Sequence, residues 1–168
     1  SGVAEPIVTY DQFAAAMINN GTTDEDIALR NKLNASNDWR IDMAGYSEAK
    51  DATNVTNVKT KIDAHTAGAV NLKLTNLKKI ATNAFTSCTK LTTIDLPAVE
   101  TIGASAFNGC TALTTLNLPA AKTISGSAFY QCSALATLNL PAAETIGVQA
   151  FNGCYAITTL NLPEAMSI

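Results

Sequence analysis

The chain has 168 residues, of which 47% are hydrophobic and 15% are charged, and its formal net charge at pH 7 is -3. This composition excludes a solvated, disordered tail, and the length suits about one domain. The acidic balance and the lack of Lys/Arg runs argue against nucleic acid and against an anionic membrane surface as partners. No stretch approaches the roughly 18 consecutive apolar residues of a membrane-spanning helix, so direct membrane insertion is not expected.

Two helices are predicted near the N-terminus. Thr9 and Gln12 have the spacing of a capping box, which predicts a helix over about residues 10–19. Thr23 and Asp26 have the same spacing and predict the start of a second short helix.

A strand, a helix and a second strand are predicted next. Apolar and polar side chains alternate over residues 39–43, which indicates a strand. Apolar side chains then share one helical face over residues 54–65, with Asn54 as the expected N-cap, and a strand follows over 70–74. This order predicts a right-handed parallel crossover. We therefore interpret residues 1–68 as a mainly helical N-terminal cap; a separate small domain with its own binding role is the alternative.

Residues 69–168 form a repeat with a constant period of about 22 residues, in about four and a half copies. The first copy is degenerate, because Thr75 stands where later copies have proline. The period is carried by Leu91, Leu113, Leu135 and Ile157, by Pro97, Pro119, Pro141 and Pro163, by Phe85, Phe107, Phe129 and Phe151, and by Cys88, Cys110, Cys132 and Cys154.

Each repeat has the pattern of a strand followed by a turn. Apolar and polar side chains alternate over residues 91–96, which predicts a half-buried strand, and Pro97 ends it. The apolar spacing over 106–110 predicts a short helical turn. A unit this short cannot bury its own apolar face, so the units must stack with their strands parallel and about 4.8 Å apart.

The repeated pattern resembles a known family. Leu-x-x-Ile/Leu-x-Leu-Pro followed by Thr-Ile-Gly-x-x-Ala-Phe-x-x-Cys, as in residues 91–110 and 135–154, is similar to the BspA-like leucine-rich repeats of bacterial surface proteins. The resemblance implies a curved parallel-sheet solenoid at the cell surface or outside the cell, with any signal peptide absent from this chain. The best-known members are adhesins, so it also implies a host matrix or plasma protein as partner. The expected fold is an α/β solenoid, a short right-handed leucine-rich-repeat superhelix with a parallel sheet, preceded by the N-terminal cap.

The sequence contains no recognisable constellation for catalysis. The four cysteines occupy one repeat position, so their Cβ atoms are expected to lie too far apart for disulfides, and we expect buried free thiols. His65 is the only histidine, and we expect it to be exposed or to interact with a helix C-terminus. Zinc motifs, phosphate loops and nucleophile elbows are not found. We therefore predict no catalytic residue, no cofactor and no metal.

The predicted binding surface is the concave, outward face of the strands. Extended concave faces are what solenoids use for binding. The face consists of Asn71, Lys73, Thr93, Asp95, Thr115, Asn117, Thr137, Asn139, Thr159 and Asn161. None of these is Trp, Tyr or Arg, the residue types that dominate hot spots.

Three functions fit this face. A module that binds a protein partner is favoured; a structural spacer with no strong ligand and a glycan-binding module are the alternatives.

Two further charged positions, Glu100 and Glu144, alternate with Lys122 and predict a surface ladder of mixed sign.

The last repeat lacks its Ala-Phe-x-x-Cys half, which predicts exposed Leu160 and Leu162 and an open strand edge. Further repeats downstream, or an end-to-end homodimer through this edge, would cover it.

Overall fold

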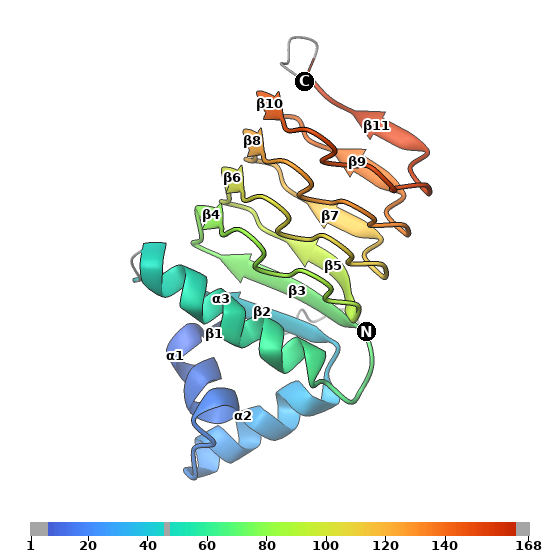
Figure 1. The fold of residues 1–168 in the computed structure, drawn as a ribbon. Coiled ribbons are helices and arrows are strands. Elements are labelled where there is room, and N and C mark those ends of the chain that lie inside the picture. The colour runs from blue at the N-terminus through green and yellow to red at the C-terminus, as the bar shows by residue number, and fades with distance from the viewer. Residues whose placement is uncertain (1–6, 46–47, 164–168) are drawn as a thin grey trace.

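The computed structural model describes residues 7–45 and 48–163, which form a stack of coils with helices packed at its N-terminal end (Figure 1). The elements of the N-terminal part are β1 (Val8–Thr9), α1 (Tyr10–Phe13), the π-helix η1 (Ala14–Ile18), α2 (Asp24–Ala35), β2 (Asp38–Asp42) and α3 (Glu48–Asp63). The strands that follow are β3 (Val70–Thr75), β4 (Lys79–Ile80), β5 (Leu91–Asp95), β6 (Thr101–Ile102), β7 (Thr115–Asn117), β8 (Thr123–Ile124), β9 (Thr137–Asn139), β10 (Thr145–Ile146) and β11 (Thr159–Asn161).

One parallel sheet runs the length of the molecule. Its seven strands lie in the order β1-β2-β3-β5-β7-β9-β11, so the N-terminal strands and the repeats share it. Thr93 pairs with Thr115, and Thr115 with Thr137, which confirms the period predicted from the sequence. The register shifts between Val70 and Asn71, where the degenerate first copy meets β5. The predicted parallel-sheet solenoid is therefore confirmed.

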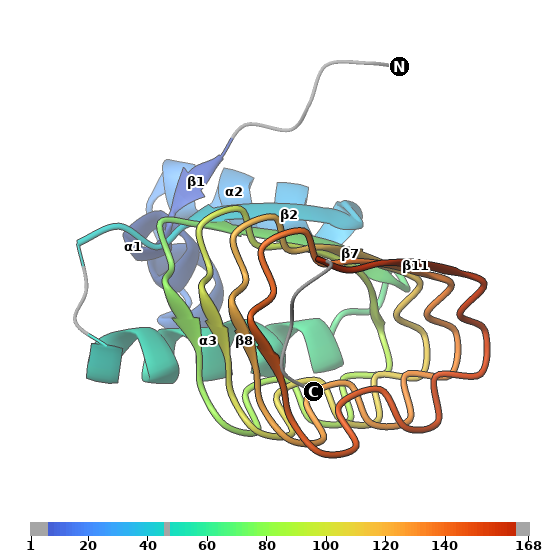
Figure 2. The ribbon, with the colours of Figure 1, turned by 90° about the horizontal axis from the view of Figure 1, so that it is seen from above.

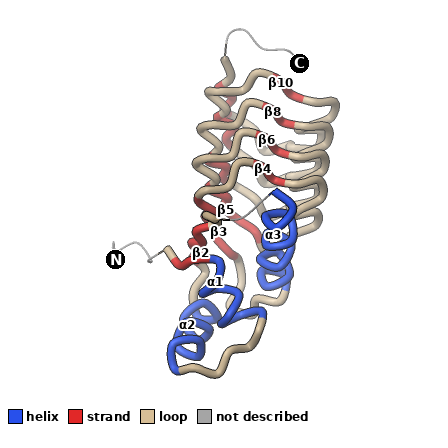
Figure 3. Tube along the Cα trace, turned by 90° about the vertical axis from the view of Figure 1, so that its left-hand side faces the viewer, coloured by secondary structure: helices blue, strands red, loops and turns tan. Residues whose placement is uncertain are grey.

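A second sheet forms another side of each coil, as the view along the stack shows (Figure 2). Its four parallel strands, β4, β6, β8 and β10, have two residues each and stack in chain order (Figure 3). Ile102 pairs with Ile124 and is fully buried. The sequence analysis did not predict this sheet, because two residues are too few to show the alternation that identifies a strand.

The segment after each short strand is a series of turns, and the predicted helical turn is wrong. Within one coil, Ser105 and Gly109 have left-handed backbones, with φ of 54° and 76°, which interrupts any helix. The amide of Phe107 donates instead to the carbonyl of Ala128 in the next coil (2.7 Å). The backbone thus makes bonds between coils here, as it does in the two sheets.

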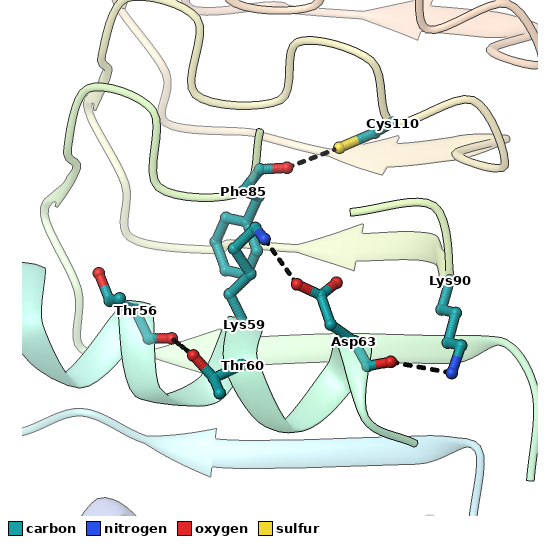
Figure 4. A network of polar contacts seen from close by, with 7 residues as sticks. All are labelled: Thr56, Lys59, Thr60, Asp63, Phe85, Lys90 and Cys110. Carbon is teal, nitrogen blue, oxygen red and sulfur yellow. Dashed lines mark hydrogen bonds and ion pairs between the residues drawn. The ribbon is translucent and has the colours of Figure 1, made fainter. Parts of the chain in front are cut away.

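Inside the coils, equivalent side chains stack on one another. The ring of Phe107 lies between those of Phe85 and Phe129, with centroids 5.2 and 5.1 Å away and nearly parallel planes. The thiol of Cys110 donates to the carbonyl oxygen of Phe85 one coil earlier (3.1 Å; Figure 4). The four cysteines are free thiols, as predicted, although Cys154 is only partly buried.

The helices of the N-terminal part begin where the sequence predicts. Thr9 and Gln12 form the capping box of α1, which continues as the π-helical turn η1 instead of ending as a regular helix. The hydroxyl of Thr23 caps α2 by accepting from the amide of Asp26 (3.1 Å). The prediction for Asn54 is wrong: it lies inside α3 and is buried, because the helix already includes Glu48.

The N-terminal part and the repeats share one hydrophobic core. Trp39 on β2 is fully buried against Phe13, with ring centroids 5.8 Å apart, and its indole N–H donates to the carbonyl of Leu33 (3.1 Å). At the end of α3, the Nζ of Lys90 donates to the carbonyl of Asp63 (2.9 Å; Figure 4). This lysine belongs to the first repeats, so it ties the helix to the solenoid and satisfies a carbonyl that helix ends leave unpaired.

Candidate functional site

The structure brings the ten residues of the predicted binding surface together on one face of the seven-stranded sheet. In β3, β5, β7 and β9 these residues lie between two buried neighbours or next to one, so their side chains point away from the core. On β11, Thr159 and Asn161 flank Leu160, which is itself exposed, and their register with β9 places them on the same face. Two rows run across the strands. One row consists of Asn71, Thr93, Thr115, Thr137 and Thr159, and the other of Lys73, Asp95, Asn117, Asn139 and Asn161. We call this surface the outward strand face.

Amide side chains hydrogen-bond along the second row. The Nδ2 of Asn117 donates to Oδ1 of Asp95 (2.7 Å), and that of Asn161 donates to Oδ1 of Asn139 (2.9 Å). Parallel strands hold these residues side by side at the spacing of the sheet, so each amide can reach its neighbour. The exposed row is therefore ordered by its own bonds, and it still presents polar atoms to solvent.

The outward strand face includes an open hollow of about 310 Å³ over β2, β3 and β5. Four predicted residues line it: Asn71, Lys73, Thr93 and Asp95. Two further lining residues, Asp38 and Arg40, come from β2 and were missed. The face thus includes an arginine, contrary to the expectation from the repeats alone. The alternation around Trp39 was the available signal, because it places Arg40 on the exposed side of its strand.

Side chains of both charges line this hollow, which we call the sheet hollow. Lys73 is the register partner of both Arg40 and Asp95, so two cations lie next to each other and a carboxylate follows. The Nζ of Lys73 lies 3.5 Å from Asp95, and Oδ1 of Asp38 accepts from Asn71 (2.7 Å). The sheet hollow can therefore offer charged and neutral groups of both hydrogen-bonding types to one ligand.

Asp42 is the last residue of β2 and lies outside the lining of the sheet hollow. Its Oδ1 accepts from the Nδ2 of Asn76 (2.7 Å) and from the amide of Ala44 (2.9 Å). The bond from Asn76, followed by that from Ala44, holds the pKa of the Asp42 carboxyl below its ordinary value. This carboxylate stays ionised and fixes the turn after β2.

His65 is buried, so its predicted exposure is wrong. Only 4% of the residue is exposed, and its ring lies edge-on to that of Trp39. Burial is the main cause that lowers the pKa of the imidazole, and Lys90 adds to it, whereas a bond to the backbone of Ser36 opposes it. The segment after α3 places His65 in the core, and the sequence pattern around a single polar residue does not reveal this burial.

Burial makes the thiols of Cys88 and Cys110 unreactive. Burial is the main cause that raises the pKa of Cys110 to about 12, so its thiolate is not populated at neutral pH. Burial is also the first cause of the raised pKa of Cys88. In the described part of the chain, no group of three or more His, Cys, Asp or Glu side chains could hold a metal ion.

The predicted charge ladder lies beside the short strands. Glu100, Lys122 and Glu144 follow one another in successive coils, each bonded through its amide to the coil before. Lys78 extends the row, with its Nζ 3.7 Å from Glu100. These side chains are exposed, and an exposed ion pair such as Lys78–Glu100 contributes little to stability.

Helices long and apolar enough to cross a bilayer are not found among residues 7–45 and 48–163.

The chain is similar to one protein family and to two solved structures. The model of the "BspA type Leucine rich repeat region (6 copies)" family matches residues 64–168. The fold is similar to the crystal structure of a leucine-rich cell surface protein from Faecalibacterium prausnitzii, with TM-score 0.53 and 27% identity over 58% of this chain and 28% of that one. A leucine-rich repeat protein of T. pallidum is more distant, with TM-score 0.40 and 23% identity over 60% of this chain and 74% of that one. No curated protein matches.

The chain corresponds to about 28% of the length of the F. prausnitzii cell surface protein. The family match covers more than half of the present chain and coincides with the stacked coils of the structure. The protein therefore belongs to the BspA-type leucine-rich repeat family.

Proposed function

We propose that this protein is a non-enzymatic recognition module that binds a host or microbial macromolecule, in first place a protein, through the outward strand face. The observation that carries the proposal is the sheet hollow, where side chains of both charges surround an open space of about 310 Å³. Ligand sites are concave and hold a few convergent polar groups. A regular sheet whose exposed polar side chains only contact water would need no such hollow.

The likeness to a cell surface protein supports an extracellular or surface location. Binding at the strand side also agrees with how solenoids present extended surfaces. The buried thiols of Cys88, Cys110 and Cys132 and the single buried histidine support a non-enzymatic role, because they are withdrawn from solvent.

Binding to an array of extracellular-matrix proteins, plasma proteins and glycans tests the proposal. The matched variant carries Asn117→Lys and Asn139→Lys, which add two charges to the outward strand face at exposed positions. We expect saturable binding by the native chain, a loss of about tenfold or more in the variant, and equal melting temperatures. A glycan as the sole ligand would support the alternative glycan-binding function. No binding anywhere would support a structural spacer.

We also propose that copies of this chain associate end to end through β11. Leu160 on this strand is 61% exposed, and β11 is the last strand of the sheet within the described residues. Exposed apolar side chains beside an open parallel edge favour pairing with another chain. Sedimentation should show a dimer that Leu160→Lys converts to monomer; a monomeric native chain would contradict this association.

A further inference from the structure

A row of four charged residues, the charge ladder, runs along the stacked coils. It consists of Lys78, Glu100, Lys122 and Glu144, all of which are exposed. The amide of each later member donates to the carbonyl of the member one coil before it, at 2.8 Å in all three cases. These identical bonds hold the four residues at the spacing of about 4.8 Å between neighbouring parallel strands.

The residues beside the charge ladder are small. Those that follow it are the first residues of three short strands, and those two positions before it are alanines: Thr101, Thr123, Thr145, Ala98, Ala120 and Ala142. Lysine and glutamate have longer side chains than threonine and alanine. The charged groups can therefore reach a second molecule that lies flat against this side of the coils.

The signs of the charge ladder alternate. From the N-terminal coil onwards they are positive, negative, positive and negative, so the reversed order has the opposite sign at every position. A second copy laid alongside with its stack antiparallel brings Lys78 opposite Glu144 and Glu100 opposite Lys122, each twice. The spacing also matches, because both copies have the same coils. A parallel copy in register would bring like charges together instead.

The ion pair inside the charge ladder leaves room for these contacts. The Nζ of Lys78 lies 3.7 Å from Oε1 of Glu100, and their side chains are 74% and 48% exposed. An ammonium group has three donors and a carboxylate has two acceptor oxygens, so each can bind a second partner. Lys122 and Glu144 form no ion pair with any residue that the structure describes.

We propose that two copies of this chain pair side by side, with their stacks antiparallel, through the charge ladder. A two-fold axis between the coils of Glu100 and Lys122 closes this arrangement, so it produces a dimer and not a filament. Exposed ion pairs are individually weak, and we therefore expect a dissociation constant of about 0.1–1 mM at low salt.

This pairing leaves the outward strand face open, because the charge ladder borders the second sheet on another side of each coil (Figure 2). A dimer would thus present two outward strand faces, and two linked sites bind a repeated partner more tightly than one site. This consequence rests on the proposed function, whereas the pairing itself does not. Sedimentation of the chain without a ligand and binding to the array therefore test the two separately.

Sedimentation equilibrium tests the pairing, with Leu160→Lys in every chain so that association through β11 does not contribute. We expect a monomer–dimer equilibrium at low salt. Salt at about 1 M, where the Debye length is about 3 Å, should shift it to monomer. A monomer at every concentration up to about 1 mM would overturn the inference.

Two variants test the order of the signs. Lys122→Glu brings two carboxylates opposite each other in both halves of the dimer and should weaken association about tenfold or more. Glu100→Lys combined with Lys122→Glu restores opposite charges at all four antiparallel positions and keeps the net charge, so the dimer should return. Unchanged association in the single variant would overturn the inference. So would a double variant that folds, by circular dichroism, and stays monomeric.

Carbodiimide cross-linking of the native chain tests the orientation. The reagent joins a lysine to a carboxylate as an amide, with loss of water. Lys78 and Glu144 are three coils apart in one chain, so an amide between them forms only between two copies. We expect mass spectrometry to find this link in the cross-linked dimer. A cross-linked dimer that lacks it would overturn the antiparallel pairing.

Discussion

The imidazole of His65 lies edge-on to the indole of Trp39, with ring centroids 5.1 Å apart and planes inclined at 72°. Its Nε2 is buried and has no hydrogen-bond partner, which suits a neutral ring. The carbonyl of His65 accepts from the Nζ of Lys90 (2.6 Å), so a positive charge already lies near the imidazole. The bond between Lys90 and His65 joins the N-terminal part of the chain to the first repeats.

The protein should lose stability as the pH falls below about 6.5. The folded state holds the pKa of His65 below its ordinary value, so on acidification the unfolded chain takes up the proton at a higher pH than the folded chain. This protonation stabilises the unfolded state and lowers the free energy of unfolding. The stability from neutral His65 is complete above about pH 6.5 and is lost as the pH falls towards the folded pKa. Thermal melting at pH 7.5 and at pH 5 measures this loss. In His65→Gln the difference should shrink; an unchanged difference would assign it to other groups.

Trp39→Ala should destabilise the whole chain in a single transition. Trp39 is fully buried and contacts Phe13, and the core continues from there into the repeats. Removing such a side chain costs about 3–5 kcal/mol. Chemical denaturation followed by circular dichroism and by tyrosine fluorescence should give coincident curves. Two transitions, of which only one moves, would support a separate N-terminal domain instead of the cap that we propose for residues 1–68.

Gly147→Ala should destabilise the protein by about 1–3 kcal/mol through steric strain. A Cβ at Gly147 would lie 2.5 Å from the amide nitrogen of Gly126 in the preceding coil, and backbone cannot move aside as a side chain can. Ser125→Ala, at the equivalent position one coil earlier, is the control and should have little effect. Denaturation midpoints compare the two variants. Equal midpoints would contradict the prediction, because they would mean that the neighbouring coils move apart to admit the added methyl group without loss of stability.

The thiols should react with a disulfide reagent in the order of their exposure. Cys88, Cys110 and Cys132 are buried, whereas Cys154 is partly exposed. At pH 8, burial keeps Cys110 protonated, with a pKa of about 12, and a protonated thiol is a poor nucleophile. Mass spectrometry should find Cys154 modified first and all four only after unfolding. Rapid modification of Cys110 in the folded chain would contradict its place in the core.

Much of the solenoid follows from the sequence by itself. A constant period with Leu, Pro, Phe and Cys in phase determines stacked, parallel coils, because equivalent side chains must lie over one another. For the same reason the two rows of the outward strand face could be named in advance. Capping signals such as that of Thr9 and Gln12 are equally local, so the starts of two helices could also be predicted.

Features that depend on contacts between distant segments were decided by the tertiary structure. The second sheet exists because two-residue strands find partners one coil away, and His65 is buried because α3 ends against Trp39 and Lys90. Arg40 lies on the outward strand face beside Lys73 because β2 and β3, which are separated by α3 in the sequence, pair in the sheet. Periodicity describes what each segment buries, whereas the sheet hollow is lined from β2, β3 and β5 and depends on how those strands meet, which only packing determines.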